Sequence, residues 1–296
     1  MNQNIFITGA AGKIGKELLK TLLDKGFDNI TVLCRTEEEK SSFSEMKITP
    51  IVGDLLNDYS YSSYLEDVDM VVHMAAITHT NDISKYYQIN SEATLNLISR
   101  CEEYGVKNFI YISTRAIAPT GGAYSKSKLM AEKHVKESCL DWMIIRPAEV
   151  YGVAGKEGVD MILNNIHKFP FVPIIGDGEY EIAPVHISDV IKAIVSVIER
   201  ADRKSRIYNI AGPESFTYNQ FIAKVLDLKG IKKRKINIPV YVFRILAKGL
   251  ALVFKDRFIA VDQLPRLLSE KSSDISVAVR DLDYNPVKLE DMFDAG

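Results

Sequence analysis

The feature that most constrains the fold of this 296-residue chain is an alternation, along its first half, of short β-branched runs with amphipathic stretches of helical length. Such an alternation is typical of βαβ units, in which a helix connects two parallel strands. The predicted strands are residues 4–8, 30–34, 48–52, 70–73, 109–113 and 142–146, and the predicted helices are residues 14–25, 83–104, 124–138 and 188–200. The pattern predicts an α/β protein with a doubly wound, parallel-sheet Rossmann fold.

The alternation changes near residue 151, where glycine and proline become frequent. We predict that residues 1–150 form the Rossmann core and that residues 178–212 return to it. Residues 151–177 and 213–296 are expected to form a small mixed α/β C-terminal lobe, too thin for a core of its own. Because open α/β sheets bind ligands at the carboxyl ends of their strands, this lobe is expected to cover the substrate.

Composition points to a small-molecule partner. The 37 basic and 39 acidic side chains nearly cancel, so no charge imbalance indicates nucleic acid or an anionic membrane. The most apolar stretch, residues 240–254, is interrupted by Arg244 and Lys248, which favours an amphipathic helix on the protein's own core over a lipid-facing surface. The N-terminus has no signal-peptide pattern, so a cytoplasmic protein is expected.

The three cysteines are few and far apart along the chain. We interpret Cys34, Cys101 and Cys139 as reduced, buried thiols rather than disulfide partners or zinc ligands. No metal site is expected.

A glycine-rich turn, TGAAGKIG at residues 8–15, follows the first strand and opens the first helix. Glycines allow a tight turn and a close approach to a pyrophosphate, whose charge is favoured by the free N–H groups of a helix N-terminus. The turn predicts a dinucleotide site, with a purely structural turn as the alternative. Its expected binding residues are Gly9, Gly12, Lys13, Ile14 and Gly15.

The end of the second strand bears on the choice of cofactor, because a carboxylate there binds the ribose 2′-OH and repels a 2′-phosphate. Here Arg35 follows the last strand residue, and no acidic residue occupies the strand end. A guanidinium suits a phosphate, so NADP is favoured over NAD. The alternative is that Arg35 is a surface residue or stacks on adenine while NAD is accepted.

Two further strand ends are expected near the cofactor. Asp54 and Leu55 follow the third strand, where a carboxylate can accept a hydrogen bond from adenine; a plain turn is the alternative for Asp54. Ala75 and Ala76 follow the fourth strand and leave room for the cofactor beside the backbone. His73, at the end of that strand, is interpreted as a packed, neutral residue.

The catalytic prediction rests on Tyr124 and Lys128, which lie four residues apart and so share one face of a helix. A phenol normally loses its proton near pH 10, and an adjacent ammonium lowers that pKa toward the range useful for acid/base catalysis. Thr114, at the end of the neighbouring strand, offers a hydroxyl to orient a substrate oxygen. The alternative is a chance surface pair.

At this point the sequence resembles the extended short-chain dehydrogenase/reductase family, also called the NAD-dependent epimerase/dehydratase family. The resemblance covers residues 4–200, with a weaker echo in DISVAVRDLDYNP, and is carried by TGAAGKIG, GDL, HMAA, INSEATLNLI, FIYIST, YSKSK, RPAEVYG and PVHISDV. It implies Tyr124 as proton donor and acceptor, Lys128 as assisting base and holder of the nicotinamide ribose, and Thr114 as the catalytic hydroxyl. It places Asn90 and Pro147 near the cofactor, and it implies a homodimer.

The sequence also departs from members that act on sugar nucleotides. Only residues 115–123 separate Thr114 from Tyr124, and no arginine precedes PVHISDV. Glu149 stands where those members often have an asparagine facing the diphosphate, and a carboxylate there would repel it. Glu149 and His186 are still expected near the substrate, although His186 also suits a packing role. Asp189 is interpreted as a helix N-terminal charge.

The leading hypothesis is a nucleoside-diphosphate-sugar epimerase, dehydratase or reductase that uses hydride transfer. The first alternative is an NADP-dependent reductase of a less charged carbonyl compound. The second is a catalytically idle NADP-binding sensor or assembly factor, against which the intact Tyr124–Lys128 pair argues.

Overall fold

Seven parallel strands form the central sheet of the computed structural model, which describes residues 3–152, 158–168, 170–200, 205–245 and 263–294. Their order is β11-β6-β5-β4-β1-β2-β3. The strands are β1 Ile5–Thr8, β2 Ile30–Cys34, β3 Thr49–Val52, β4 Met70–His73, β5 Asn108–Ile112, β6 Asp141–Pro147 and β11 Arg206–Ile210. The order reverses between β1 and β4, which makes their carboxyl ends the expected ligand site. The predicted Rossmann fold is confirmed.

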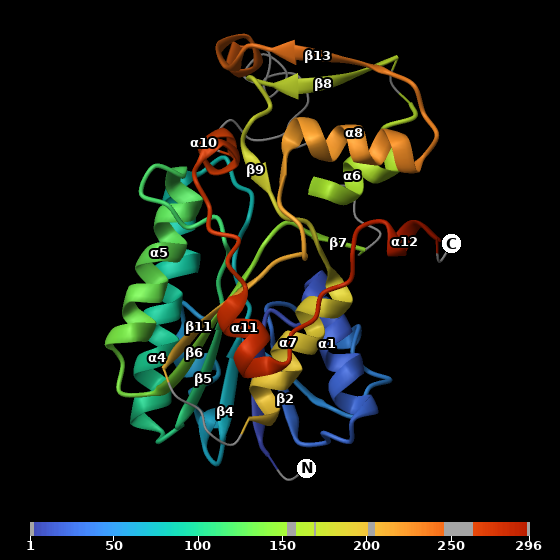
Figure 1. The fold of residues 1–296 in the computed structure, drawn as a ribbon. Helices are drawn as coiled ribbons and strands as arrows, with labels where there is room; N and C mark the ends of the chain where they lie inside the picture. The colour runs from blue at the N-terminus through green and yellow to red at the C-terminus, as the bar shows by residue number, and fades with distance from the viewer. Residues whose placement is uncertain (1–2, 153–157, 169, 201–204, 246–262, 295–296) are drawn as a thin grey trace.

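Helices cover both faces of this sheet (Figure 1). Alternate residues of each strand point to opposite faces, so Ile5 and Ile7 pack into one core and Phe6 into the other. One core lies under α1 and α7, and the second lies under α4 and α5. The helices are α1 Lys13–Asp24, α2 Glu37–Ser41, α3 Ile83–Tyr87, α4 Ala93–Glu103, α5 Gly122–Glu137 and α7 Ile187–Glu199, with short 3-10 turns η1 Asp58–Ser60 and η2 Ser62–Leu65.

The predicted single helix at residues 83–104 is divided. A π-helical turn, η3 Gln88–Glu92, separates α3 from α4. In this turn Asn90 is fully buried, and its amide exchanges two hydrogen bonds with the backbone of Ile77. Because π-turns inside helices are frequently found at functional sites, this break places Asn90 among the residues to examine.

The lobe above the sheet has a hydrophobic cluster of its own, so the expectation of a lobe too thin for a core was wrong. The apolar face of α8 supplies Phe221, Ile222 and Val225, which pack with Val172 and Ile174 of β8. The sequence analysis predicted neither β8 nor its partner β13. The lobe elements are α6 Gly158–Asn165, β8 Phe171–Ile175, α8 Tyr218–Leu228 and β13 Arg234–Ile238, and short pairs join β7 Val150–Tyr151 to β10 Val185–His186 and β9 Glu181–Ile182 to β12 Phe216–Thr217.

The C-terminal residues return to the Rossmann core. Helix α10 Gln263–Leu268 packs on α5, and α11 Ser276–Leu282 packs on β11 and α7 (Figure 1). The hydroxyl of Tyr284 donates a hydrogen bond to the carbonyl of Ala211 at 2.9 Å, and α12 Asp291–Asp294 follows. Residues 263–275, which we call the strap, therefore run from α10 to α11 along the carboxyl edge of the sheet.

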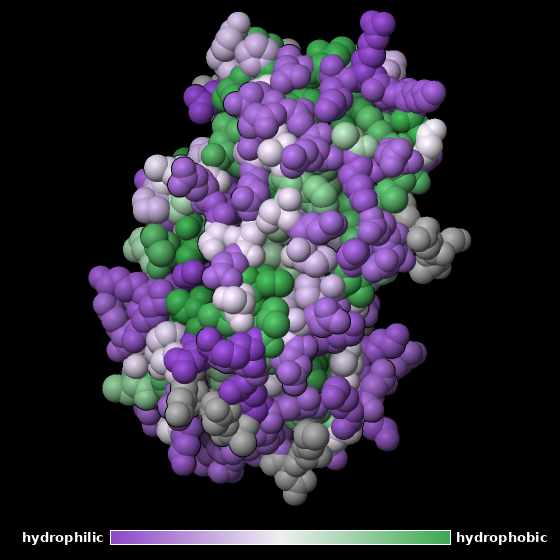
Figure 2. Space-filling model, in the orientation of Figure 1, coloured by the Kyte–Doolittle hydropathy of each residue, from purple (hydrophilic) through white to green (hydrophobic). Residues whose placement is uncertain are grey.

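The surface seen in Figure 2 mixes hydrophilic and hydrophobic residues. Among the described helices, none is long and apolar enough to cross a membrane. Of the predicted helix at residues 240–254, the structure describes residues 240–245, which are helical; the rest lies outside the described residues. Cys34 and Cys101 are buried as predicted, but Cys139 is exposed because it lies in the turn between α5 and β6.

Candidate active site

The glycine turn lies at the reversal of strand order. Gly9 has a φ of +74°, and a Cβ atom there would lie 2.5 Å from the backbone nitrogen of Ala75. A Cβ on Gly15 would lie 2.5 Å from Ala10, so α1 begins in direct contact with the turn. Gly12 is the N-cap of α1 and supplies no side-chain cap, which leaves the first N–H groups, including those of Lys13 and Ile14, available to an anion.

At the end of β2 the structure adds a residue that the sequence analysis missed. The backbone N–H of Arg35 donates to the Glu39 carboxylate at 2.8 Å, and the guanidinium of Arg35 pairs with the same carboxylate at 3.4 Å. The strand end is therefore not free of acidic groups, because the first turns of α2 bring one back to it. The Arg35 side chain remains 75% exposed.

The two neighbouring strand ends differ in accessibility. Asp54 is exposed, and its carboxylate accepts the N–H of Leu56 at 2.9 Å, which is the geometry of a side-chain turn; Leu55 is buried. Ala75 and Ala76 follow β4 and are half-buried. The Asn90 amide donates to Ile77 and, at 3.1 Å, to the hydroxyl of Ser127, so both of its donors are used inside the protein.

His73 is fully buried between two hydroxyls. Its ring nitrogens lie 2.6 Å from the Thr8 hydroxyl and 2.9 Å from that of Thr94. Burial, reinforced by the positive charge of Lys128, lowers the pKa of His73 to about 3. It is therefore the packed, neutral residue that the sequence predicted.

The structure brings Tyr124, Lys128 and Thr114 together. Helix α5 begins at Gly122, so Tyr124 lies in its first turn and Lys128 one turn later. The Tyr124 side chain is buried, and its ring meets that of Tyr86 edge-on at 5.9 Å. Burial raises the pKa of Tyr124, while the positive charge of Arg266 and the Thr114 hydroxyl oppose this rise.

Lys128 is held by groups other than the phenol. Its ammonium donates to the carbonyl of Ile112 at 2.8 Å and lies 4.2 Å from the centre of the Tyr111 ring. Burial lowers the pKa of Lys128 to about 7, against the opposing effect of Glu132. The ammonium is therefore close to losing its charge at neutral pH.

A buried carboxylate lies one turn further along α5. Glu132 accepts hydrogen bonds from Ser113 at 2.6 Å and from Arg146 at 2.8 and 2.5 Å. It also pairs with Lys136 at 3.3 Å. Despite its burial, these partners keep the pKa of Glu132 below its ordinary value.

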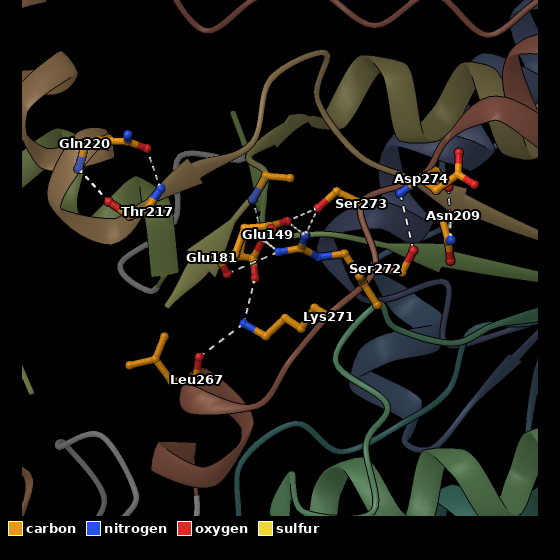
Figure 3. Close-up of polar contacts among 12 residues, drawn as sticks. Glu149, Glu181, Asn209, Thr217, Gln220, Leu267, Lys271, Ser272, Ser273 and Asp274 are labelled. Atoms are coloured by element: carbon orange, nitrogen blue, oxygen red, sulfur yellow. Dashed lines mark hydrogen bonds and ion pairs between the residues drawn. The ribbon is translucent and has the colours of Figure 1, made fainter. Parts of the chain in front are cut away.

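Glu149 lies in an ionic cluster that the sequence analysis did not anticipate (Figure 3). Its carboxylate pairs with Arg115 at 2.7 Å and with Lys271 of the strap at 3.2 Å, and both cations are only 2% exposed. Arg115 also pairs with Glu181 at 3.3 Å and donates to the hydroxyl of Ser273. The cluster balances two cations against two carboxylates. The two cations, with the N–H of Ala183, hold the pKa of Glu149 below its ordinary value despite burial.

The remaining predicted residues lie at the end of β6 and at the start of α7. Pro147 ends β6, where its carbonyl accepts the N–H of Arg115 at 2.9 Å. His186 is the N-cap of α7, and its ring packs edge-on against Tyr151 at 5.3 Å. Asp189 is buried and accepts the N–H of Val287 at 2.8 Å, so it fastens the C-terminal segment as well as carrying a charge near the start of α7. Within the described residues, no group of acidic, histidine or cysteine side chains could hold a metal.

Comparison with known proteins identifies the family. Residues 5–211 match the model of the NAD dependent epimerase/dehydratase family. The chain belongs to this family. It is an NAD(P)-dependent enzyme of the extended short-chain dehydrogenase/reductase type, as its motifs predicted.

Its relatives differ in substrate. The decarboxylating sterol-4-alpha-carboxylate 3-dehydrogenase of Dictyostelium discoideum is 25% identical and aligned over 86% of this chain and 85% of its own length. UDP-glucose 4-epimerase of Vibrio cholerae is 22% identical, and the alignment covers 97% of this chain and 92% of that protein. A solved UDP-glucuronic acid 4-epimerase from Bacillus cereus, in complex with UDP-glucuronic acid and NAD, shares the fold with a TM-score of 0.75 at 24% identity, covering 98% of this chain and 96% of that one.

Proposed function

We propose that this enzyme acts on a nucleoside-diphosphate sugar as an epimerase, dehydratase or reductase. The observation that carries the proposal is the buried Tyr124 phenol, which lies one helical turn from Lys128 on α5 and whose pKa the Thr114 hydroxyl helps to lower, at the carboxyl edge of the sheet. A dinucleotide fits the same edge, because the glycine turn leaves no room for a Cβ and presents the free N–H groups of α1. The bound nicotinamide would supply or accept the hydride at its C4 atom.

The chain's own residues would handle the proton and the substrate oxygen. Thr114 would donate a hydrogen bond to that oxygen and orient it toward Tyr124. Tyr124 would take the proton from a hydroxyl or return it to a carbonyl as general base or acid. Lys128, held against the Ile112 carbonyl, would contribute positive charge below the pKa of about 7 that burial gives it.

The ionic cluster reduces the repulsion that Glu149 would exert on a substrate diphosphate. A lone carboxylate at position 149 would repel a substrate diphosphate, but Arg115 and Lys271 neutralise Glu149. This charge balance supports the leading hypothesis, and the intact Tyr124–Lys128 pair on α5 argues against a catalytically idle sensor.

The proposal is tested by Tyr124→Phe, which removes the proton-transferring hydroxyl and keeps the ring. Turnover of UDP-glucose, UDP-glucuronic acid or dTDP-glucose should fall about 10²–10⁴-fold, while cofactor affinity measured by calorimetry stays unchanged. Tyr59→Phe, at a side chain 91% exposed, is the matched control and should keep full activity. Wild-type activity in Tyr124→Phe would refute the assignment, and turnover of none of these sugars by the wild type would refute the substrate class.

We further propose NADP as the preferred cofactor, on the exposed guanidinium of Arg35 at the end of β2. Arg35→Gln should weaken NADP binding about tenfold and NAD binding little, because a charged hydrogen bond to the 2′-phosphate is lost. Glu39→Gln should strengthen NADP binding, since the carboxylate both repels the phosphate and holds Arg35. Lys40→Gln, on the same helix, is the control. Equal losses for both cofactors in Arg35→Gln would show that Arg35 serves adenine instead.

A further inference from the structure

A cation from the strap lies over the face of the Tyr124 ring. The guanidinium carbon of Arg266, on α10, lies 4.8 Å from the centre of the Tyr124 ring, and α10 packs directly on α5. Within the described part of the chain, Arg266 forms no ion pair with a carboxylate.

Lys128 does not replace this cation. Its ammonium faces the Ile112 carbonyl and the Tyr111 ring, and with a pKa lowered by burial to about 7 it loses its charge as the pH rises above neutrality. An arginine keeps its charge throughout this range. Above pH 7, Arg266 is therefore the more persistent of the two positive charges near Tyr124.

A guanidinium over an aromatic ring is attracted by the negative face of the π system. The attraction grows when the phenol loses its proton, because the ring then carries a full negative charge, so the cation favours the phenolate over the phenol. This agrees with the direction in which Arg266 acts on the pKa of Tyr124, opposite to burial.

Contacts of the strap fix the position of Arg266. Lys271 donates to the carbonyl of Leu267 at 3.4 Å, at the C-terminal end of α10, while it pairs with Glu149 at 3.2 Å (Figure 3). Ser273 hydrogen-bonds both Arg115 and Glu181. The ionic cluster thus ties the helix that carries Arg266 to the ends of the catalytic strands.

We propose that Arg266 is a positioning residue of the active site, a permanent cation that stabilises deprotonated Tyr124 and so extends the general-base activity of this phenol down toward neutral pH. The inference rests on the proposed role of Tyr124. The other titratable or charged groups packed around this phenol in the described residues are Tyr86 from α3, Tyr111 from β5, Lys128 and, two turns along α5, Glu132.

The test is a titration of Tyr124 in the NAD-bound protein, labelled with ¹³C at the tyrosine ζ carbon. The Tyr124 resonance is identified by its absence in Tyr124→Phe. In Arg266→Gln its titration midpoint should rise by about one pH unit, and in Arg266→Lys, which keeps a cation, it should stay closer to the wild type. In the pH profile of kcat/KM, the apparent pKa assigned to Tyr124 should also move to higher pH in Arg266→Gln.

Unchanged resonances of the other tyrosines control for misfolding in each variant. Identical behaviour of Tyr124 in the wild type and Arg266→Gln, including no titration up to pH 11 in either, would overturn the proposal. The titration does not depend on turnover, so retained activity in Tyr124→Phe would refute the proposed function without affecting this measurement of Arg266.

Discussion

His73 and Lys128 show how burial lowers the pKa of two basic side chains in the same region. Both are almost inaccessible to water, and for both burial is the largest cause of a lowered pKa, to about 3 and about 7. The cost of burying a charge explains the direction in each case. Their consequences differ, because the role proposed for Lys128 requires a charge, whereas His73 only has to pack.

For His73 this predicts a pH-dependent stability. Between pH 6.5 and 3 the unfolded chain binds a proton that the native His73 does not, so the free energy of unfolding falls as the pH falls through this window. From pH 6.5 to 5, the wild type should lose about 1.5 kcal/mol more than His73→Gln, which keeps polar atoms for Thr8 and Thr94. Urea unfolding at the two pH values measures this difference. Equal losses would mean that native His73 takes up the proton.

At the scale of elements, α5 places three ionisable side chains on one face of a single helix. Tyr124, Lys128 and Glu132 follow one another at four-residue intervals, so a single helix sets their order and their spacing. Glu132 opposes the effect of burial on the pKa of Lys128, and its own burial is compensated by Arg146 and Ser113.

Glu132→Gln should therefore destabilise the protein by about 3 kcal/mol, because Arg146 loses the partner of a mostly buried ion pair. Glu137→Gln, at a 61% exposed position on the same helix, is the matched control and should leave stability almost unchanged. Chemical denaturation of both variants provides the measurement. Equal, small effects would show that water compensates Arg146.

The break in the helix at residues 83–104 was not visible in the sequence. Its apolar residues keep a helical spacing throughout, which predicts one continuous helix. The π-turn at Gln88–Glu92 accompanies the burial of Asn90 against Ile77 and Ser127, two groups that come from other segments. A local pattern contains no information about such partners.

At the scale of the whole molecule, the strap is the element that completes the site. It joins the C-terminal part of the chain to the end of β5 through Ser273 and to the end of β6 through Lys271, and it places Arg266 on Tyr124. The lobe and the Rossmann core each have their own hydrophobic cluster, and the Arg115–Glu181 ion pair links β9 of the lobe to the end of β5.

The sequence by itself determined six of the seven strands of the central sheet, all except β11, together with the glycine turn and the spacing of Tyr124 and Lys128. These features depend on residues close together in the chain, whose periodicity and conformational preferences are local properties. Strand ends were therefore predicted to within one residue, and the family motifs followed in order.

Only the tertiary structure decided which charges meet. Glu149 looked like an obstacle to a diphosphate until Arg115 and Lys271, 34 and 122 residues away, proved to neutralise it. Glu39 likewise reaches the end of β2 only because α2 folds back on that strand. Such pairings depend on where the chain returns in space and on burial, which strengthens every charge interaction by excluding water, and neither can be read from the order of residues.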